Sequence, residues 1–343
     1  MFDNKNFIGG GYRVNSLNLI RLLACIEVMY GHITYHLECF PPSIFGKVIH
    51  LFQGVPIFFV ISGFLIYFSI EKTPNFKTFF SKRVLRLYPE LWVCVLIELV
   101  SILVFYHEPI DWKQFALFGF GQGTVFQYWT PDFLRGYGVS APNGSLWTIP
   151  PIVEFYILIW LCYKFLNKHK MAVWIGVIVA SLFFSISWEL VADAYSETFF
   201  YKLVGVTVFP FLWIFLVGAF IARFYDKLIP FLSKYWWSFL LFLMFFSWSN
   251  LDVYASYGIG KTLSLAAFVI GFAYQFPKIN IKTDISYAVY IYHMIFVNIA
   301  VELGWIKNWG VLVMVVIVTI IFALLSTKYV GGWSRLQKKR INN

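Results

Sequence analysis

The feature that most constrains this chain is a series of apolar runs, each about twenty residues long. As a helix, a run of this length crosses the hydrocarbon core of a bilayer, which is about 30 Å thick. Because lipid offers no water to the backbone, such runs are expected to be helical throughout. We predict ten spans, at 17–37, 48–70, 87–106, 146–166, 171–192, 203–223, 231–250, 260–276, 285–304 and 309–330.

The composition supports a membrane fold. Of the 343 residues, 60% are hydrophobic, 22% are aromatic and only 13% are charged. A soluble protein of this length has no way to bury so much apolar surface. The predicted fold class is therefore all-α, a polytopic integral membrane helix bundle of about ten transmembrane helices.

The basic residues follow the predicted topology. With the N-terminus in the cytoplasm, twenty of the 27 Lys and Arg lie on cytoplasmic segments, six lie outside, and Arg21 lies within a span. This asymmetry is the positive-inside pattern, and it predicts that both termini are cytoplasmic. The net charge of +10 is thus explained by orientation in the membrane, and nucleic acid is not expected as a partner.

The chain divides into a cytoplasmic N-terminal segment at 1–16, a transmembrane domain at 17–330 and a basic cytoplasmic tail at 331–343. Within the domain, the longest non-spanning segment is an outer loop at about 107–144, rich in Gly, Phe and Gln. Loops of this length are usually functional. We expect a flexible aromatic lid or an interfacial hairpin.

The first span carries Arg21, Glu27, His32 and His36. Such groups cost several kcal/mol at membrane depth and are rarely kept without a partner or a task. Arg21 and His32 are eleven residues apart, or three turns plus about 20°, so they share one helix face about 16 Å apart along the axis. Glu27 is rotated from both by about 120° or more, so it has no assigned role and needs a partner.

Two other patterns on the inner side and in the first span allow more than one interpretation. Arg83 and Arg86 precede the third span on one helix face, and they fit either lipid anchoring or binding of a cofactor's phosphates. His32 and His36 have the spacing of two metal ligands on one turn. No third ligand follows at useful spacing, so no metal is expected.

Five strings in the chain resemble, in order, motifs of acyltransferase family 3, a family of bacterial integral membrane proteins. These are RLLACIEVMYGH (Arg21 to His32), PIFFVISGFLI (Pro56 to Ile66), SKRVLRLYPELW (Ser81 to Trp92), NGSLWTIP (Asn143 to Pro150) and SYAVYIYH (Ser286 to His293). They are similar to the family's Arg-x10-His, FFxISGFL, RxxR(I/L)xP, SLWxL and SYxxYLxH motifs. None is diagnostic alone, but five in order on ten spans are specific.

The resemblance implies an enzyme that moves an acyl group, usually acetyl, from cytoplasmic acyl-CoA to a hydroxyl of a glycan. We expect acetyl-CoA as the donor, a cell-envelope or exported polysaccharide of the O-antigen or exopolysaccharide type (or its lipid-linked precursor) as the acceptor, and the bacterial inner membrane as the location. The glycan, the hydroxyl and the oligomeric state are not determined by these motifs.

The resemblance also implies roles for individual residues. His32 is the expected catalytic base, because transfer to an alcohol needs a group that takes the hydroxyl proton near neutral pH. Arg21, Arg83 and Arg86 are the expected ligands of the CoA phosphates or pantetheine, with snorkelling to lipid headgroups as the alternative for Arg21.

Six further residues are expected to line a cavity or contact the acceptor. Helix capping is the alternative for Ser145, and buried packing is the alternative for Tyr287, Tyr290 and His293. They are Ser145, Trp147, Glu154, Tyr287, Tyr290 and His293.

One position departs from the family pattern. The family usually has an acidic residue five positions after the Trp of SLW, but this chain has Ile152 there and a carboxylate at Glu154. A shift of two residues turns a helical side chain by about 200°. Either the helix is unwound at Pro150 and Pro151 and Glu154 reaches the same place, or the role is absent.

Two rival functions belong to other classes. A transporter or flippase of lipid-linked saccharides also needs many spans and intramembrane charges, but it is typically built from inverted repeats, which we do not find. A degenerate, non-catalytic family member would fit the Ile152 departure.

Overall fold

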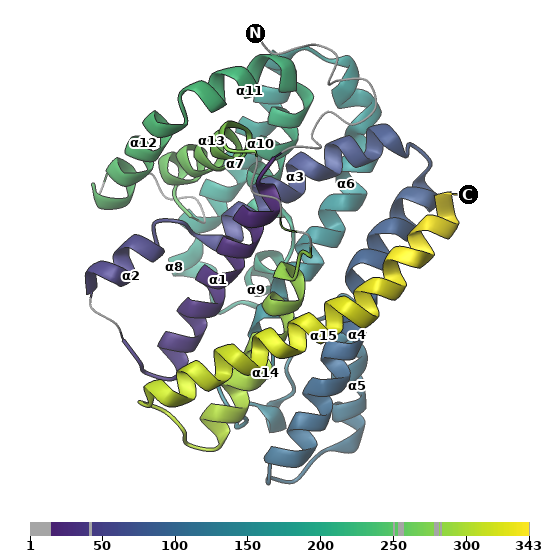
Figure 1. Cartoon of the computed structure of the whole chain (residues 1–343), viewed down its shortest axis with the longest axis vertical. Helices are drawn as coiled ribbons and strands as arrows, with labels where there is room; N and C mark the ends of the chain where they lie inside the picture. Colours follow the sequence, from purple (N-terminus) through teal and green to yellow (C-terminus); the bar gives the residue numbers. More distant parts are fainter. Residues whose placement is uncertain are drawn as a thin grey trace.

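The computed structural model describes residues 15–40, 43–249, 251–252, 257–277, 281 and 283–342. Within these residues the regular structure is helical and contains no strand, as predicted (Figure 1). The helices are α1 (Leu17–His36), α2 (Ser43–Ile49), α3 (Gly54–Lys72), α4 (Phe76–Phe105), α5 (Trp112–Gln122), η2 (Asp132–Leu134), η3 (Gly144–Thr148), α6 (Ile149–Lys168), α7 (Met171–Leu190), α8 (Ala192–Tyr195), α9 (Phe199–Gly205), η4 (Phe209–Phe211), α10 (Leu212–Arg223), α11 (Tyr225–Lys234), α12 (Trp236–Trp248), α13 (Ile259–Gln275), α14 (Ser286–Glu302) and α15 (Trp309–Asn342).

The chain is a multi-helix membrane protein. In the described residues, 6 helices are long and apolar enough to cross a membrane, and the number rises to 8 if the bent pairs at 199–223 and 225–248 each form one span. Two further predicted spans coincide with α13 and α14, which have 17 residues each and are therefore only about 26 Å long. The total of about ten spans, and the side on which each terminus lies, stay predictions.

Two helices extend beyond the predicted spans. The third span was expected to begin at residue 87, but α4 begins at Phe76, where the Asn75 side chain accepts a hydrogen bond from the Thr78 amide at 3.1 Å. Pro89 then lies inside a continuous 30-residue helix. α15 continues through the basic tail predicted at 331–343 and ends at Asn342, and the division of the chain into segments stays a prediction. The predicted N-terminal segment 1–16 lies outside the described residues except for 15–16.

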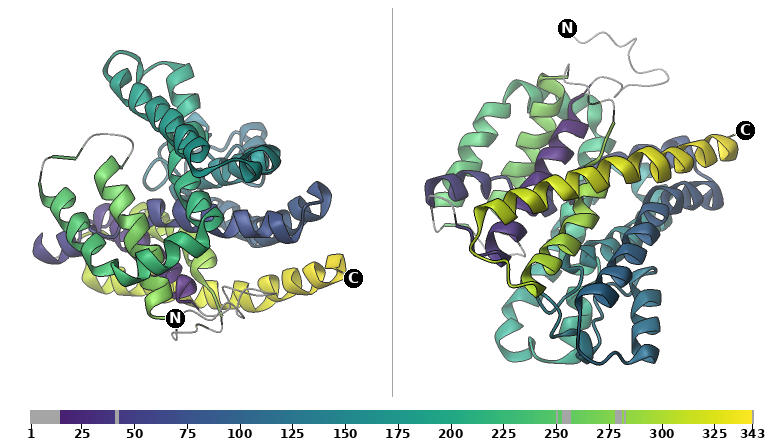
Figure 2. Two further views of the ribbon diagram at one scale, coloured as in Figure 1. Left: turned by 90° about the horizontal axis from the view of Figure 1, so that it is seen from above. Right: turned by 60° about the horizontal axis from the view of Figure 1, so that its bottom comes forward.

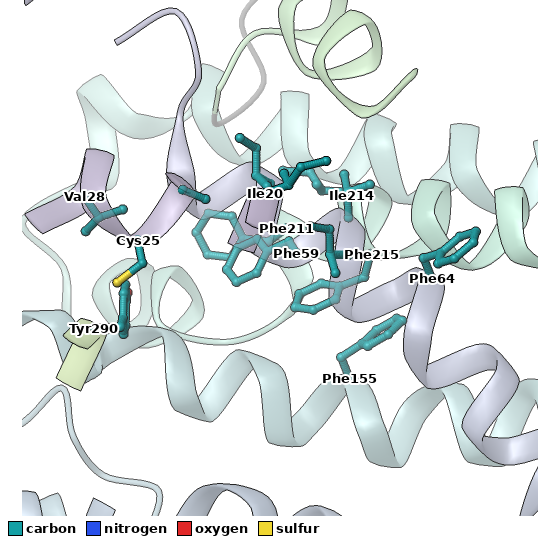
Figure 3. Packing of buried hydrophobic residues seen from close by; sticks show 14 of the residues in the cluster. Ile20, Cys25, Val28, Phe59, Phe64, Phe155, Phe211, Ile214, Phe215 and Tyr290 are labelled. Carbon is teal, nitrogen blue, oxygen red and sulfur yellow. The ribbon is translucent and has the colours of Figure 1, made fainter. Parts of the chain in front are cut away.

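The centre of the bundle is α3, which packs against α1, α6, α10 and α13. On α3, Phe59 stacks on Phe215 of α10 with ring centroids 4.5 Å apart, and Phe155 of α6 stacks on the same ring at 4.2 Å (Figure 3). Gly63 lets the backbones of α3 and α10 meet, because a Cβ there would lie 2.8 Å from the Phe215 carbonyl carbon. Small residues at helix crossings permit this close approach in membranes.

The outer loop at 107–144 is more ordered than predicted. It contains α5, which packs on the end of α4 through a small apolar cluster that includes Phe115, Phe118 and Ile102. Its later part is fastened to α14, where the Gly138 amide donates to Glu302 Oε2 and the Val139 amide donates to Asn298 Oδ1, both at 2.8 Å. The loop therefore contacts one end of α14, and its role as a lid or an interfacial hairpin stays a prediction.

Two arrangements of long helices position the candidate site. α1 lies beside α14, although their paired residues His32 and His293 are 261 positions apart in the sequence. The C-terminal helix α15, yellow in the ribbon views, crosses both α4 and α14 (Figures 1 and 2). The part of α15 between Thr327 and Lys338 is thereby brought next to the starts of α1 and α14.

Candidate active site

Two polar contacts join α1 to α14. Near the start of both helices, Arg21 Nη1 donates a hydrogen bond to Asp284 Oδ2 at 2.6 Å. Further along, His32 Nδ1 lies 2.8 Å from His293 Nε2. Because residue numbers increase in the same sense along both helices, α1 and α14 run in the same direction. The predicted first and ninth spans must also do so.

Asp284 orients the Arg21 guanidinium. Its other carboxylate oxygen accepts hydrogen bonds from the Ser286 hydroxyl at 2.6 Å and the Ser286 amide at 3.1 Å. Burial acts to raise the pKa of the Asp284 carboxyl, but Arg21, the Ser286 hydrogen bonds and Arg86 more than offset this, so the pKa lies below its ordinary value. The carboxylate is ionised at neutral pH.

Hydrogen bonding sets the tautomer of the histidine pair. His293 is fully buried, and its Nδ1 lies 3.2 Å from the Val289 carbonyl oxygen, which can only accept. Nδ1 of a neutral His293 therefore carries the proton, and its Nε2 has a free lone pair that accepts from His32 Nδ1–H. This leaves His32 Nε2 unprotonated and able to take a proton. His32 is only partly buried, so an acceptor can reach it.

A narrow cavity lies beside Arg21, bordered by α1, α3, α4, α6 and α14. Its lining is mostly apolar, and it includes all three arginines expected to bind the donor, Arg21, Arg83 and Arg86. Arg83 donates one hydrogen bond to the Ser69 hydroxyl at 2.9 Å, while its buried Nε has no partner. The cavity therefore has cationic donors and apolar walls in one continuous space.

Two predicted tyrosines line this cavity. Tyr287 donates a hydrogen bond to the Leu87 carbonyl oxygen at 2.9 Å, and the Tyr290 hydroxyl lies 3.0 Å from the hydroxyl of Thr148. The Tyr290 ring also lies 6.1 Å from the His293 ring, between centroids. His32 and His293 are not on the cavity wall, but Tyr290 links that wall to the histidine pair.

Two residues expected at the cavity lie elsewhere. Ser145 is fully buried, and its hydroxyl donates to Asn143 Oδ1 at 2.7 Å, while Asn143 in turn donates to the Ile291 carbonyl of α14 at 2.9 Å. Trp147 packs on Phe211, with ring centroids 5.4 Å apart. Neither residue lines the cavity. These contacts are made by η3, and Ser145 does not cap the helix as the alternative expected, because its hydroxyl bonds to a side chain.

Glu154 does not lie on the cavity wall. α6 is continuous from Ile149, with both prolines in its first turn, so the helix is not unwound there. Ile152 lines the cavity, whereas Glu154 points away and accepts a hydrogen bond from the Val208 amide at 2.7 Å. The expectation that Glu154 belongs to the cavity is therefore wrong, because the two positions face different sides of one helix.

Glu27 has the partners that its burial requires. Its Oε2 accepts a hydrogen bond from the Gly54 amide at 2.8 Å, and its Oε1 lies 3.0 Å from His50 Nδ1. Gly54 is the first residue of α3, so Glu27 satisfies one of the amides that a helix start leaves unpaired. This role is structural and separate from the face of Arg21 and His32.

The structure also identifies a residue that the sequence predictions omitted. Asp284 lies two positions before the SYAVYIYH string, and a carboxylate just before a helix is a recognisable signal for capping. Its pairing with Arg21 had no signal, because nothing in the sequence indicated that α14 lies beside α1. In the described part of the chain, no group of three or more His, Cys, Asp and Glu side chains is placed to hold a metal ion.

Comparisons with known proteins agree with the motif pattern. A family model for acyltransferase 3, described as an acyltransferase domain, matches residues 14–328. Nodulation protein 10 of Rhizobium leguminosarum bv. viciae is 30% identical over 349 residues, which cover 94% of this chain and 93% of that protein. An O-acetyl transferase of Shigella phage Sf6 is 26% identical over 82% of this chain and 84% of its own length. The peptidoglycan O-acetyltransferase OatA of Listeria monocytogenes is 28% identical over 43% of this chain and 23% of its own length. No solved structure matches.

Proposed function

This chain belongs to acyltransferase family 3, and we propose that it is an O-acetyltransferase that moves acetyl from cytoplasmic acetyl-CoA to a hydroxyl of a glycan. The proposed acceptor is a cell-envelope or exported polysaccharide, or its lipid-linked precursor. The proposed location is the bacterial inner membrane, with both termini in the cytoplasm. The observation that carries the proposal is the line from the arginine-bearing cavity to the histidine pair.

The cavity suits an acyl-CoA arm. Arg21, Arg83 and Arg86 supply cationic donors for phosphate or amide oxygens, and the apolar walls suit an uncharged chain. Arg21 and His32 are separated by about 16 Å along α1, a distance comparable with an extended pantetheine arm. A donor held at the arginines thus directs its thioester toward Tyr290 and the histidines.

The proposed step begins at the acceptor. His32 Nε2 takes the hydroxyl proton while the hydroxyl oxygen forms a bond to the thioester carbonyl carbon. The C–S bond then breaks, and CoA leaves as a thiolate that is protonated afterwards. His293 stabilises the positive charge that develops on His32, because it keeps accepting the hydrogen bond from Nδ1–H. A relay through an acylated protein side chain is a second route to the same product.

The proposal is tested with purified full-length protein and labelled acetyl-CoA. The candidate acceptors are O-antigen polysaccharide, exopolysaccharide, peptidoglycan fragments and chitooligosaccharide. Wild type should label at least one glycan, and His32→Ala should lower the rate about 10²- to 10⁴-fold. His36→Ala is the matched control, because His36 lies one turn further on the same helix and forms no hydrogen bond with His293 in the described part of the chain.

Equal labelling by wild type and His32→Ala would remove His32 from the mechanism. Labelling of no acceptor, together with transport of a lipid-linked saccharide, would instead favour the transporter. Binding of acetyl-CoA and glycan without any labelling would favour a non-catalytic member of the family. Ile152, which lies on the cavity wall in place of an acidic residue, is the observation that supports this rival.

A further inference from the structure

A second, more open cavity adjoins the first. The two cavities share Arg21, Arg86 and Tyr287, so these three side chains form the boundary between them. The second cavity is bordered by α1, α4, the start of α14 and the last turns of α15. Its charged lining residues are Arg21, Arg86, Glu90, Asp284, Arg335 and Lys338.

The charges in this second cavity are unbalanced. Four cations face two carboxylates, and Asp284 is already paired with Arg21. Arg335 donates one hydrogen bond to the Thr327 carbonyl oxygen at 3.3 Å. Arg86 and Lys338 form neither a hydrogen bond nor an ion pair within the described part of the chain. Cations that repel one another in a partly enclosed space bind an anion placed between them.

Lys338 differs from its neighbours in the basic tail. It is half-buried in the cavity wall and close enough to Arg86, Glu90 and Arg335 to interact with them electrostatically, whereas Lys339 and Arg340 are exposed. A tail that served only to anchor the chain at a membrane surface would expose all of its cations to lipid headgroups and water. Lys338 instead lines the second cavity.

We propose that this second cavity binds the phosphates at the nucleotide end of CoA, and that Lys338 and Arg335 on α15 form one side of the site. The inference rests on the proposed function, because it assigns the rest of the same donor. CoA carries a diphosphate and a 3′-phosphate, a charge that matches the excess of cations. The shared residues Arg21 and Arg86 place this phosphate end directly beside the cavity for the arm.

The test measures binding of CoA and of pantetheine, which has no phosphate, to the purified full chain in detergent. Lys338→Ala is expected to weaken CoA binding about tenfold or more, the effect of losing a charge-assisted hydrogen bond to phosphate. Lys339→Ala is the matched control, and it should bind CoA like wild type. Pantetheine should bind both variants equally. In turnover, Lys338→Ala should raise the KM for acetyl-CoA and leave kcat unchanged, because the phosphates take no part in the chemical step.

Equal affinity of the two lysine variants for CoA would overturn the inference. The anion could also be the phosphate of a lipid headgroup. Unchanged CoA affinity in Lys338→Ala, with loss of co-purifying phosphatidylglycerol, would show that case and likewise overturn the inference. Failure of the proposed function has a different signature, namely that folded wild-type protein binds no CoA at all.

Discussion

The most informative single perturbation is at His293. His293→Phe keeps a ring of similar size in a fully buried position, so it removes the acceptor of the His32 Nδ1–H hydrogen bond with little change in packing. Without that acceptor, neither tautomer of His32 is preferred, and the imidazolium that forms during transfer loses a partner. His293→Gln is the conservative companion, because a side-chain amide oxygen can accept the same hydrogen bond.

The size of the effect follows from the contact that is lost. A hydrogen bond to a charged group is worth about 1.5–3 kcal/mol. Each 1.4 kcal/mol changes a rate about tenfold, so His293→Phe should lower kcat for acetyl transfer about 10- to 150-fold. The KM for acetyl-CoA should stay the same, since His293 is not on the wall of the donor cavity. His293→Gln should recover most of the loss.

The assay is acetyl transfer from labelled acetyl-CoA at saturating donor, with thermal unfolding in detergent to show that each variant is folded. A positioning role and a purely structural role give different results, because only positioning separates the Gln and Phe variants in kcat at equal stability. If folded His293→Phe transfers acetyl within twofold of wild type, the tautomer argument is wrong.

Three further predictions concern stability and donor affinity. Asp284→Asn should lower the free energy of unfolding by about 2 kcal/mol, the value of a charge-assisted hydrogen bond to Arg21. The pKa of Asp284 is depressed in the folded protein. The contribution is therefore fully present above the unfolded pKa of about 3.9 and is lost only as pH falls through the lower folded pKa. Melting curves from pH 8 to 3 check this, and a wild-type advantage that shrinks between pH 8 and 5 would contradict it. Gly63→Leu should destabilise the bundle by about 3 kcal/mol, since a side chain there meets the α10 backbone. Gly176→Leu is the control and should be near neutral, because a Cβ there meets nothing within 4 Å. Equal melting temperatures of the two variants would refute the packing argument. Glu90→Gln should tighten CoA binding a few-fold by removing a carboxylate that faces the second cavity, and weaker binding measured by titration would count against a phosphate site there.

Features that depend on the geometry of a single helix could be predicted from the sequence. The shared face of Arg21 and His32 follows from their spacing, and the structure places both side chains toward the same neighbour, α14. The all-helical fold of the described residues also agrees with prediction.

Features that depend on contacts between helices far apart in the sequence could not be predicted from single-helix geometry. Asp284 and His293 complete the site only because α14 lies beside α1, and hydrophobic periodicity carries no information about which helices are neighbours. The order of the outer loop likewise comes from its hydrogen bonds to Asn298 and Glu302 on α14. The side on which Glu154 lies depended on whether Pro150 and Pro151 unwind α6. Because α6 is continuous from Ile149, Glu154 and Ile152 face different sides of the helix.

The central claim is that a donor held at Arg21 delivers its acetyl group to an acceptor at His32, about 16 Å further along one helix. The most direct measurement uses the protein reconstituted in sealed vesicles in a single orientation, with labelled acetyl-CoA supplied only on the side of the C-terminus. The account predicts labelled glycan when the acceptor is on the opposite side, and none with His32→Ala. Labelling only when donor and acceptor share a side would contradict it.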